Sequence, residues 1–415
     1  MKKAALILFA LLILALSVLC VSYLHFTDAK LNIGSLLPGT AATAPPTPEP
    51  TPEVTPEPTP EPTPEPTPEP PLPEGAVTYM DGKRVESVNN QGADYVGLSQ
   101  IGSVLGFEPG ESGDGAVSLT WRKQPVTLTT GGSECRYGDR SGTLSAPALR
   151  YHDEVWVPVE DFCKLLEISV FVDEESGIRY CTPGAGDWAL PEGYKVPVLM
   201  YHGVSDNPWT MPSLFVTPAE MEAHLQYLQD NGYTPIWFED LWHVQDFEKP
   251  VILTFDDGYV DNYTTLLPIL EKYNAKATCF IITDFLNHDP SIYANVDQYV
   301  TWDMVKAMSE SGYISIQSHT MNHWDLNEFM RSSQEKELYG SYLNLIRETG
   351  KEPFVLAYPE GQADGNTFEL TAEIYRFGLK MSGPIYVTGD DPTLVYRVYI
   401  PRGMSMEEYA RQLAA

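Results

Sequence analysis

From residue 183 onward, short apolar segments alternate with amphipathic stretches, and this alternation restricts the possible folds more than any other feature of the chain. Apolar runs that predict strands lie at 196–201, 251–255, 277–282 and 313–317. Between them, residues 218–230 and 266–273 space their apolar side chains as helices do. Strands that alternate with helices are typical of a parallel sheet covered by helices. We therefore predict an α/β fold for residues 183–415.

Polar side chains stand where two of these strands end. Asp256 and Asp257 directly follow the second strand, and His319 and His323 follow the fourth. Asp-Asp-Gly alone is often a turn, and a histidine pair alone is often incidental, but parallel folds build their sites at the carboxyl ends of strands. Two imidazoles and one carboxylate hold a divalent ion with open positions, and a second carboxylate can act as general base. The two clusters together predict a catalytic metal site.

The sequence resembles polysaccharide deacetylases of carbohydrate esterase family 4 in two motifs, Thr254-Phe255-Asp256-Asp257-Gly258 and His319-Thr320-Met321-Asn322-His323. The resemblance covers about 196–403. It implies a distorted (β/α) barrel that binds one divalent metal ion, with zinc expected first and cobalt, nickel or manganese as alternatives. It also implies the roles of four residues, namely Asp256 as general base and Asp257, His319 and His323 as metal ligands.

The third motif of the family is altered in this chain. The corresponding stretch is Ala357-Tyr358-Pro359-Glu360-Gly361, which lacks the arginine that usually orients the base and has a glutamate in place of an aromatic residue. Ala-Tyr-Pro at this point is similar to the branch that deacetylates poly-N-acetylglucosamine. The resemblance also implies that the backbone N–H of Glu360 stabilises the oxyanion. Together with the position of Trp324 directly after the second motif, it predicts substrate contacts from Tyr358, Pro359, Glu360 and Trp324.

The carboxy-terminal acid histidine of the family is also absent, because no histidine follows His323. In the poly-N-acetylglucosamine branch an early Tyr-His takes that role. The stretch Leu199-Met200-Tyr201-His202-Gly203-Val204 is similar to that early motif. The resemblance therefore implies that His202 is the catalytic general acid, which protonates the departing amine.

These features predict a metal-dependent hydrolase that removes N-acetyl groups from an N-acetylglucosamine-containing polysaccharide outside the cell or in the cell wall, releasing acetate. Two alternatives stay open: an O-acetyl esterase on a wall glycan, and a glycan-binding surface protein without catalysis. Lys and Arg number 26 against 57 Asp and Glu, a net charge of −31. That balance argues against a surface that neutralises phosphates, so we expect no nucleic-acid partner. The resemblance implies a polysaccharide partner, and we expect a monomer.

The first 75 residues predict an anchor and a spacer. Residues 4–24 form an apolar run behind Lys2 and Lys3, long enough to cross the hydrocarbon core at about 1.5 Å per residue. We predict a transmembrane signal-anchor within 1–30 and a single-pass protein of the cell membrane with its catalytic domain extracellular; a cleaved signal would make it secreted. Residues 31–75 carry a Thr-Pro-Glu-Pro repeat, which predicts a disordered, extended linker.

Residues 76–182 carry a weak internal repeat. Tyr95-Val96-Gly97-Leu98 matches Trp156-Val157-Pro158-Val159 at an offset of 61 residues, and each copy predicts a short strand, a helix and a further strand. The pattern resembles the small α+β domain named after the N-terminal region of copper amine oxidases, which implies neither copper nor catalysis. We therefore predict four segments: the anchor at 1–30, the linker at 31–75, the small α+β domain at 76–182 and the catalytic domain at 183–415.

Overall fold

The structure is a computed structural model that describes residues 71–186, 189–287 and 298–414. The predicted signal-anchor and most of the predicted linker lie outside the described residues. Within the described ranges, no helix combines the length and the apolar character needed to cross a membrane. The last residues of the predicted linker pair with the small domain, since the Gly75 N–H donates to the Ser87 carbonyl and the Asn89 N–H to the Pro73 carbonyl.

A nine-stranded sheet forms the framework of the catalytic part, and all its pairings are parallel. In spatial order the strands are β25 (Val395–Tyr396), β23 (Phe377–Lys380), β22 (Val355–Ala357), β21 (Ile314–Ser318), β20 (Ala277–Ile281), β19 (Pro250–Phe255), β15 (Val198–Tyr201) and β26 (Val398–Tyr399), with β18 (Thr234–Ile236) beside β19. The predicted α/β fold is confirmed. The strand expected at 196–201 is interrupted at Pro197, so that only its second part joins this sheet.

The sheet closes on itself almost completely. Strands β25 and β26 stand at opposite ends of the strand order, yet only Arg397 separates them in the sequence. Two strands that follow each other within one residue must lie together, so the two ends of the sheet meet. The result is the nearly closed parallel barrel that the resemblance implied, and Arg397 lies at its closure.

Alternate residues of the strands face the two sides of the sheet, as strand geometry requires. Along β19, Leu253 and Phe255 belong to the core that the outer helices share, whereas Ile252 packs with Phe280 in a second core inside the barrel. Asp256, one residue past the end of β19, is in register with Ile252, whose side chain faces the inside of the barrel. Its side chain is therefore directed into the barrel.

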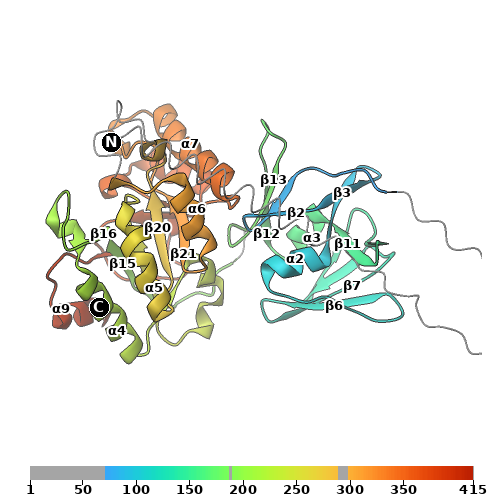
Figure 1. The fold of residues 1–415 in the computed structure, drawn as a ribbon, viewed down its shortest axis with the longest axis horizontal. Helices are drawn as coiled ribbons and strands as arrows, with labels where there is room; N and C mark the ends of the chain where they lie inside the picture. The colour runs from blue at the N-terminus through green and yellow to red at the C-terminus, as the bar shows by residue number, and fades with distance from the viewer. Residues whose placement is uncertain (1–70, 187–188, 288–297, 415) are drawn as a thin grey trace, which may run out of the picture. The chain divides into compact units, whose positions relative to one another are not determined.

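Among the described residues of the catalytic part, six α-helices cover the sheet or its connections (Figure 1). They are α4 (Pro218–Asp230), α5 (Leu267–Tyr273), α6 (Trp302–Glu310), α7 (Arg331–Thr349), α8 (Gly365–Ile374) and α9 (Met406–Ala414). Helix α4 has the predicted bounds because Thr217 and Glu220 form a capping box at its start, with Pro218 at the first helical position.

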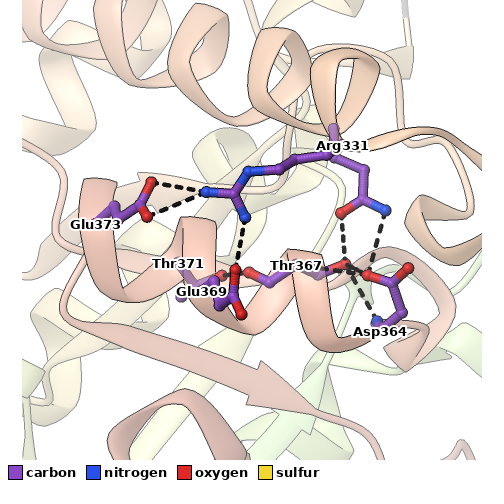
Figure 2. Close-up of polar contacts among 7 residues, drawn as sticks. Arg331, Asp364, Thr367, Glu369, Thr371 and Glu373 are labelled. Carbon is purple, nitrogen blue, oxygen red and sulfur yellow. Dashed lines mark hydrogen bonds and ion pairs between the residues drawn. The ribbon is translucent and has the colours of Figure 1, made fainter.

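Helices α7 and α8 are joined by polar contacts (Figure 2). Arg331, at the start of α7, pairs with Glu369 and Glu373 of α8. Asp364 caps α8 by accepting a hydrogen bond from the Thr367 backbone N–H. These contacts join the first turns of α7 to α8. The later turns of α7 extend toward the predicted metal site.

The predicted internal repeat is visible in the small part. The first copy contains β4 (Ala93–Gly97) and α2 (Leu98–Leu105), and the second contains β11 (Glu154–Pro158) and α3 (Val159–Leu165). Each strand and helix of the second copy begins 61 residues after its counterpart. The strands of the two copies pair with each other, since β4 lies antiparallel to β11. The resemblance to the copper amine oxidase N-terminal region stays a prediction.

Candidate active site

A cavity of about 360 Å³ opens at the carboxyl ends of the barrel strands. It brings together most of the predicted site residues from segments far apart in the sequence. The acidic, basic and histidine residues that line it are His202 after β15, Asp256 and Asp257 after β19, His319 and His323 after β21, Glu360 after β22, and Arg397 between β25 and β26.

Asp257, His319 and His323 form a cluster whose ligand atoms lie within 4.8 Å of one another. The Nε2 atoms of His319 and His323 lie 3.4 Å and 3.6 Å from the same oxygen, Oδ1 of Asp257. Nδ1–H of His319 donates to the Ala357 carbonyl at 2.8 Å, which leaves the Nε2 lone pair directed at the cluster. One carboxylate and two imidazoles that converge in this way fit the protein ligands of a catalytic divalent ion.

The charges around this cluster favour a deprotonated Asp257. Burial alone would raise the pKa of Asp257, but the neighbouring imidazoles of His319, His202 and His323 hold it well below its usual value. Burial also lowers the pKa of His323, and the charge of His319 lowers it further. A carboxylate and a neutral imidazole are the forms that bind a metal ion.

Asp256 is held by a buried, bidentate ion pair with Arg397. The Nη1–Oδ1 and Nη2–Oδ2 distances are 2.6 Å and 2.8 Å, and the two side chains are only 1% (Arg397) and 4% (Asp256) exposed. Burial would raise the pKa of Asp256, but the charge of Arg397 holds it below its usual value. The carboxylate is therefore ionised and fixed in orientation, as a general base must be.

Two residues just past the first motif, Asp261 and Asn262, hydrogen-bond the backbone of the segment that carries His202. The Asn262 amide donates to the His202 carbonyl at 2.9 Å, and the Val204 N–H donates to the Asp261 carboxylate at 2.7 Å. Burial raises the pKa of Asp261 to about 6. Nδ1 of His202 is buried without a hydrogen-bond partner among the described residues. These hydrogen bonds hold the backbone around His202. Its imidazole lies in the cavity, where it contacts the ring of Tyr399 edge-on.

Left-handed backbone conformations are concentrated at this site. Asp257, Thr320, His323 and Glu360 have φ angles of 74°, 66°, 56° and 52°. Residues with side chains adopt this region at a cost, and they persist there only when the surrounding structure holds them. A strained backbone therefore sets the direction of two of the three cluster side chains, Asp257 and His323.

The four predicted substrate contacts lie differently in the structure. The ring of Tyr358 is fully buried, and its hydroxyl lies within hydrogen-bond distance of Oγ1 of Thr371 in α8 and of the Thr393 carbonyl, so only its main chain can face the cavity. Trp324 is 42% exposed and stacks on Phe329, outside the lining of the cavity. Pro359 is buried beside Tyr358. Of these four residues, Tyr358 and the exposed Glu360 line the cavity, and their contacts with the substrate stay predictions.

Sequence reasoning missed the role of Arg397, although the residue replaces the arginine that the third motif lacks. The pair with Asp256 spans 141 positions, and nothing near Arg397 in the sequence marks it. Tyr259 and Tyr299, which also line the cavity, were missed as well. Tyr259 directly follows Asp-Asp-Gly, so its position beside the first motif was the available signal.

A parallel barrel with two imidazoles, a carboxylate and a second, ionised carboxylate at its mouth has the construction of a metal-assisted hydrolase. The model of the family described as polysaccharide deacetylase matches residues 243–377. A Bacillus subtilis (strain 168) protein, named as the polysaccharide deacetylase YxkH, is 33% identical over 217 residues, which are 51% of this chain and 73% of that protein. The chain therefore belongs to the polysaccharide deacetylase family, carbohydrate esterase family 4, and is a hydrolase.

Two further comparisons fall on the same half of the chain. The poly-beta-1,6-N-acetyl-D-glucosamine N-deacetylase of Escherichia coli (strain K12) is 23% identical over 259 residues, which are 52% of this chain and 38% of that protein. The Streptococcus pyogenes deacetylase PplD, solved in complex with acetate, aligns with a TM-score of 0.48 at 28% identity, over 53% of this chain and 99% of that one. Deacetylases of this family are metal-dependent, and the Asp257–His319–His323 cluster is the corresponding candidate.

We expect the protein to bind about one equivalent of zinc, and His323→Ala to weaken that binding by at least about 100-fold, because two remaining ligands hold the ion poorly. Isothermal titration with the metal-free protein measures the affinity. His243→Ala is the matched control, since His243 is half-buried outside the cluster. Equal weakening in both variants would contradict a site at Asp257, His319 and His323.

Replacement of Arg397 tests the state of Asp256. Arg397→Gln removes the positive charge that lowers the pKa of Asp256, so this pKa rises. The acid limb of the pH profile of kcat/KM then moves to higher pH, and activity is lost first under mildly acidic conditions. Arg397→Lys retains the charge but not the bidentate geometry, and should lower kcat by about 10- to 100-fold with a smaller shift of the limb.

The control for this experiment is Arg402→Lys, because Arg402 hydrogen-bonds main-chain carbonyl groups outside the cavity. Circular dichroism checks folding, since breaking a buried ion pair costs about 3–5 kcal/mol. An unchanged acid limb in folded Arg397→Gln would show that Arg397 does not control the ionisation of Asp256.

Proposed function

We propose that the protein hydrolyses N-acetyl groups of an N-acetylglucosamine-containing polysaccharide outside the cell, with a divalent metal ion, and releases acetate. One observation carries the proposal. The three candidate ligands, an ionised carboxylate and the imidazole of His202 line a single cavity of about 360 Å³. The names of the relatives, which include a poly-N-acetylglucosamine deacetylase and a peptidoglycan-N-acetylglucosamine deacetylase of Bacillus cereus, support the substrate class.

The residues divide the reaction between them. A divalent ion bound by Asp257, His319 and His323 would supply Lewis-acid polarisation and a more acidic water. Asp256, kept ionised by Arg397, accepts the proton of the attacking water. The imidazole of His202, across the same cavity, donates a proton to the amine as the carbon–nitrogen bond breaks.

The oxyanion of the tetrahedral intermediate needs a hydrogen-bond donor, and the main chain of Glu360 is the candidate. Its left-handed φ of 52° turns the peptide away from the path of an ordinary strand end. Backbone N–H groups fixed in this way stabilise developing charge without reorganising during the reaction. The function of Glu360 then depends on its main chain, and its side chain is free for another task.

Acetate release from N-acetylglucosamine oligomers by the full chain is the direct test. We expect release that stops with a chelator and returns when zinc is added. Asp256→Asn and His202→Ala should each lower kcat by about 100-fold or more, because general acid and base catalysis contribute about 10²–10⁴-fold.

His224→Ala is the control for His202, since His224 is a buried core residue stacked on Tyr409. Release from O-acetylated but not from N-acetylated sugars would favour the O-acetyl esterase. Metal binding without any release would favour the glycan-binding alternative.

The charges of the cavity restrict the substrate further. Among the described lining residues, Asp256, Asp257 and Glu360 are acidic and Arg397 is the one Lys or Arg, already paired with Asp256. With a divalent ion on Asp257, Glu360 would bring the sum of these charges to zero. A carboxylate on the sugar then finds no net attraction, and the exposed carboxylate of Glu360 repels one that binds beside it, so a neutral glycan is favoured over an anionic one.

The two substrates are an N-acetyl sugar oligomer that bears a carboxylate and the methyl ester of the same oligomer. We expect the wild-type enzyme to prefer the methyl ester. Glu360→Gln should reduce that preference by about three- to tenfold. The ratio of the two kcat/KM values measures the effect, which should shrink at high ionic strength because the charge is exposed. Glu335→Gln, which removes an exposed carboxylate of α7 outside the cavity, is the control. An unchanged ratio in Glu360→Gln would contradict charge selection.

The apolar run at 4–24 and the proline-rich repeat behind it support a location at the outer face of the cell membrane, with the catalytic domain held away from the bilayer. Protease accessibility of the catalytic domain on intact cells tests this location.

A further inference from the structure

The segment between the two candidate histidine ligands follows a strained path. Thr320 and His323 both have left-handed backbones, with φ angles of 66° and 56°. Within the segment, the Thr320 N–H donates to Oγ of Ser318, and the His323 N–H donates to Oγ1 of Thr320. These local bonds stabilise the turn, but they do not fix it relative to Asp257.

Glu337 of α7 holds the middle of this segment. Its two carboxylate oxygens accept hydrogen bonds from Asn322, one from the backbone N–H and one from the side-chain amide, both at 2.8 Å. Glu337 is only 2% exposed. A carboxylate is one of the few side chains that accept two N–H bonds side by side, and both oxygens here are directed at the residue next to His323.

The same face of α7 contacts the segment over two further turns. A Cβ added at Gly340 would lie 2.1 Å from the sulfur of Met321, so the helix and the segment approach too closely for any larger residue. Ser341 shares a hydrogen bond with Ser318 at 2.8 Å, and Asn344 donates to Thr283, whose own N–H donates to the Thr320 carbonyl. Positions 337, 340, 341 and 344 form one stripe of a helix. This stripe therefore lies along the histidine segment.

We propose that Glu337 is a positioning residue of the metal site, which fixes Asn322 so that the imidazole of His323 faces Asp257. The inference rests on the proposed metal site and assigns the residue that orients it. Partners of this kind, one step away from the ligands, typically change metal affinity by about 10- to 100-fold when removed.

The test compares zinc affinity of the full-length protein, measured by competition with a chromophoric chelator, in wild type, Glu337→Ala and Glu337→Gln. We expect affinity about 10- to 100-fold weaker in Glu337→Ala, with Glu337→Gln between the two because one acceptor oxygen remains. The visible spectrum of the cobalt form should change in the same order, since it reports the geometry of the ligands.

Gln334→Ala provides the matched control. Gln334 is buried one turn earlier on α7, and it hydrogen-bonds the Phe329 carbonyl and Asp364 rather than the histidine segment. It should lower the melting temperature of the metal-free protein and leave zinc affinity unchanged. Equal zinc affinity in wild type and the folded Glu337→Gln and Glu337→Ala variants would overturn the inference alone. Failure of the wild type to bind zinc or cobalt would overturn the metal site and the inference with it.

Discussion

The ion pair between Asp256 and Arg397 is the interaction on which the arrangement of the site depends. Arg397 is also within hydrogen-bond distance of Oγ1 of Thr254 and of the Lys380 carbonyl, so it joins β19 to the strands that close the barrel. Buried ion pairs are weak sources of stability, because two charges lose their hydration. This pair is better explained by what it fixes: an ionised carboxylate at the point where both ends of the sheet meet.

The sequence predicted the elements whose periodicity is strong. Helix α4 has the expected bounds, and β19 and β21 agree with the predicted strands to within one residue. The strands that close the barrel were not predicted, because β25 and β26 have two residues each and carry no pattern. Short segments of this kind adopt strand pairing only because the rest of the barrel presents open edges to them.

The candidate site was predicted from local motifs, and its remaining parts are non-local. Asp257, His319 and His323 were recognisable because the chain places them directly after strands. Glu337 and Arg397 act on these motifs from other elements, and a sequence shows no contact across such separations. Tyr358 shows a different limit, because the motif marks the residue but not its orientation: its ring packs against α8, and its contact with the substrate stays a prediction.

Rigid support and strained backbone belong together in this molecule. The left-handed residues Asp257, Thr320 and His323 would relax in a free peptide, and here β19, β21 and α7 hold them. The stripe of α7 that contacts the histidine segment is held there by the buried hydrogen bonds of Glu337 and Ser341. The imidazoles can then be close to Asp257 before any ion binds, so less reorganisation accompanies binding.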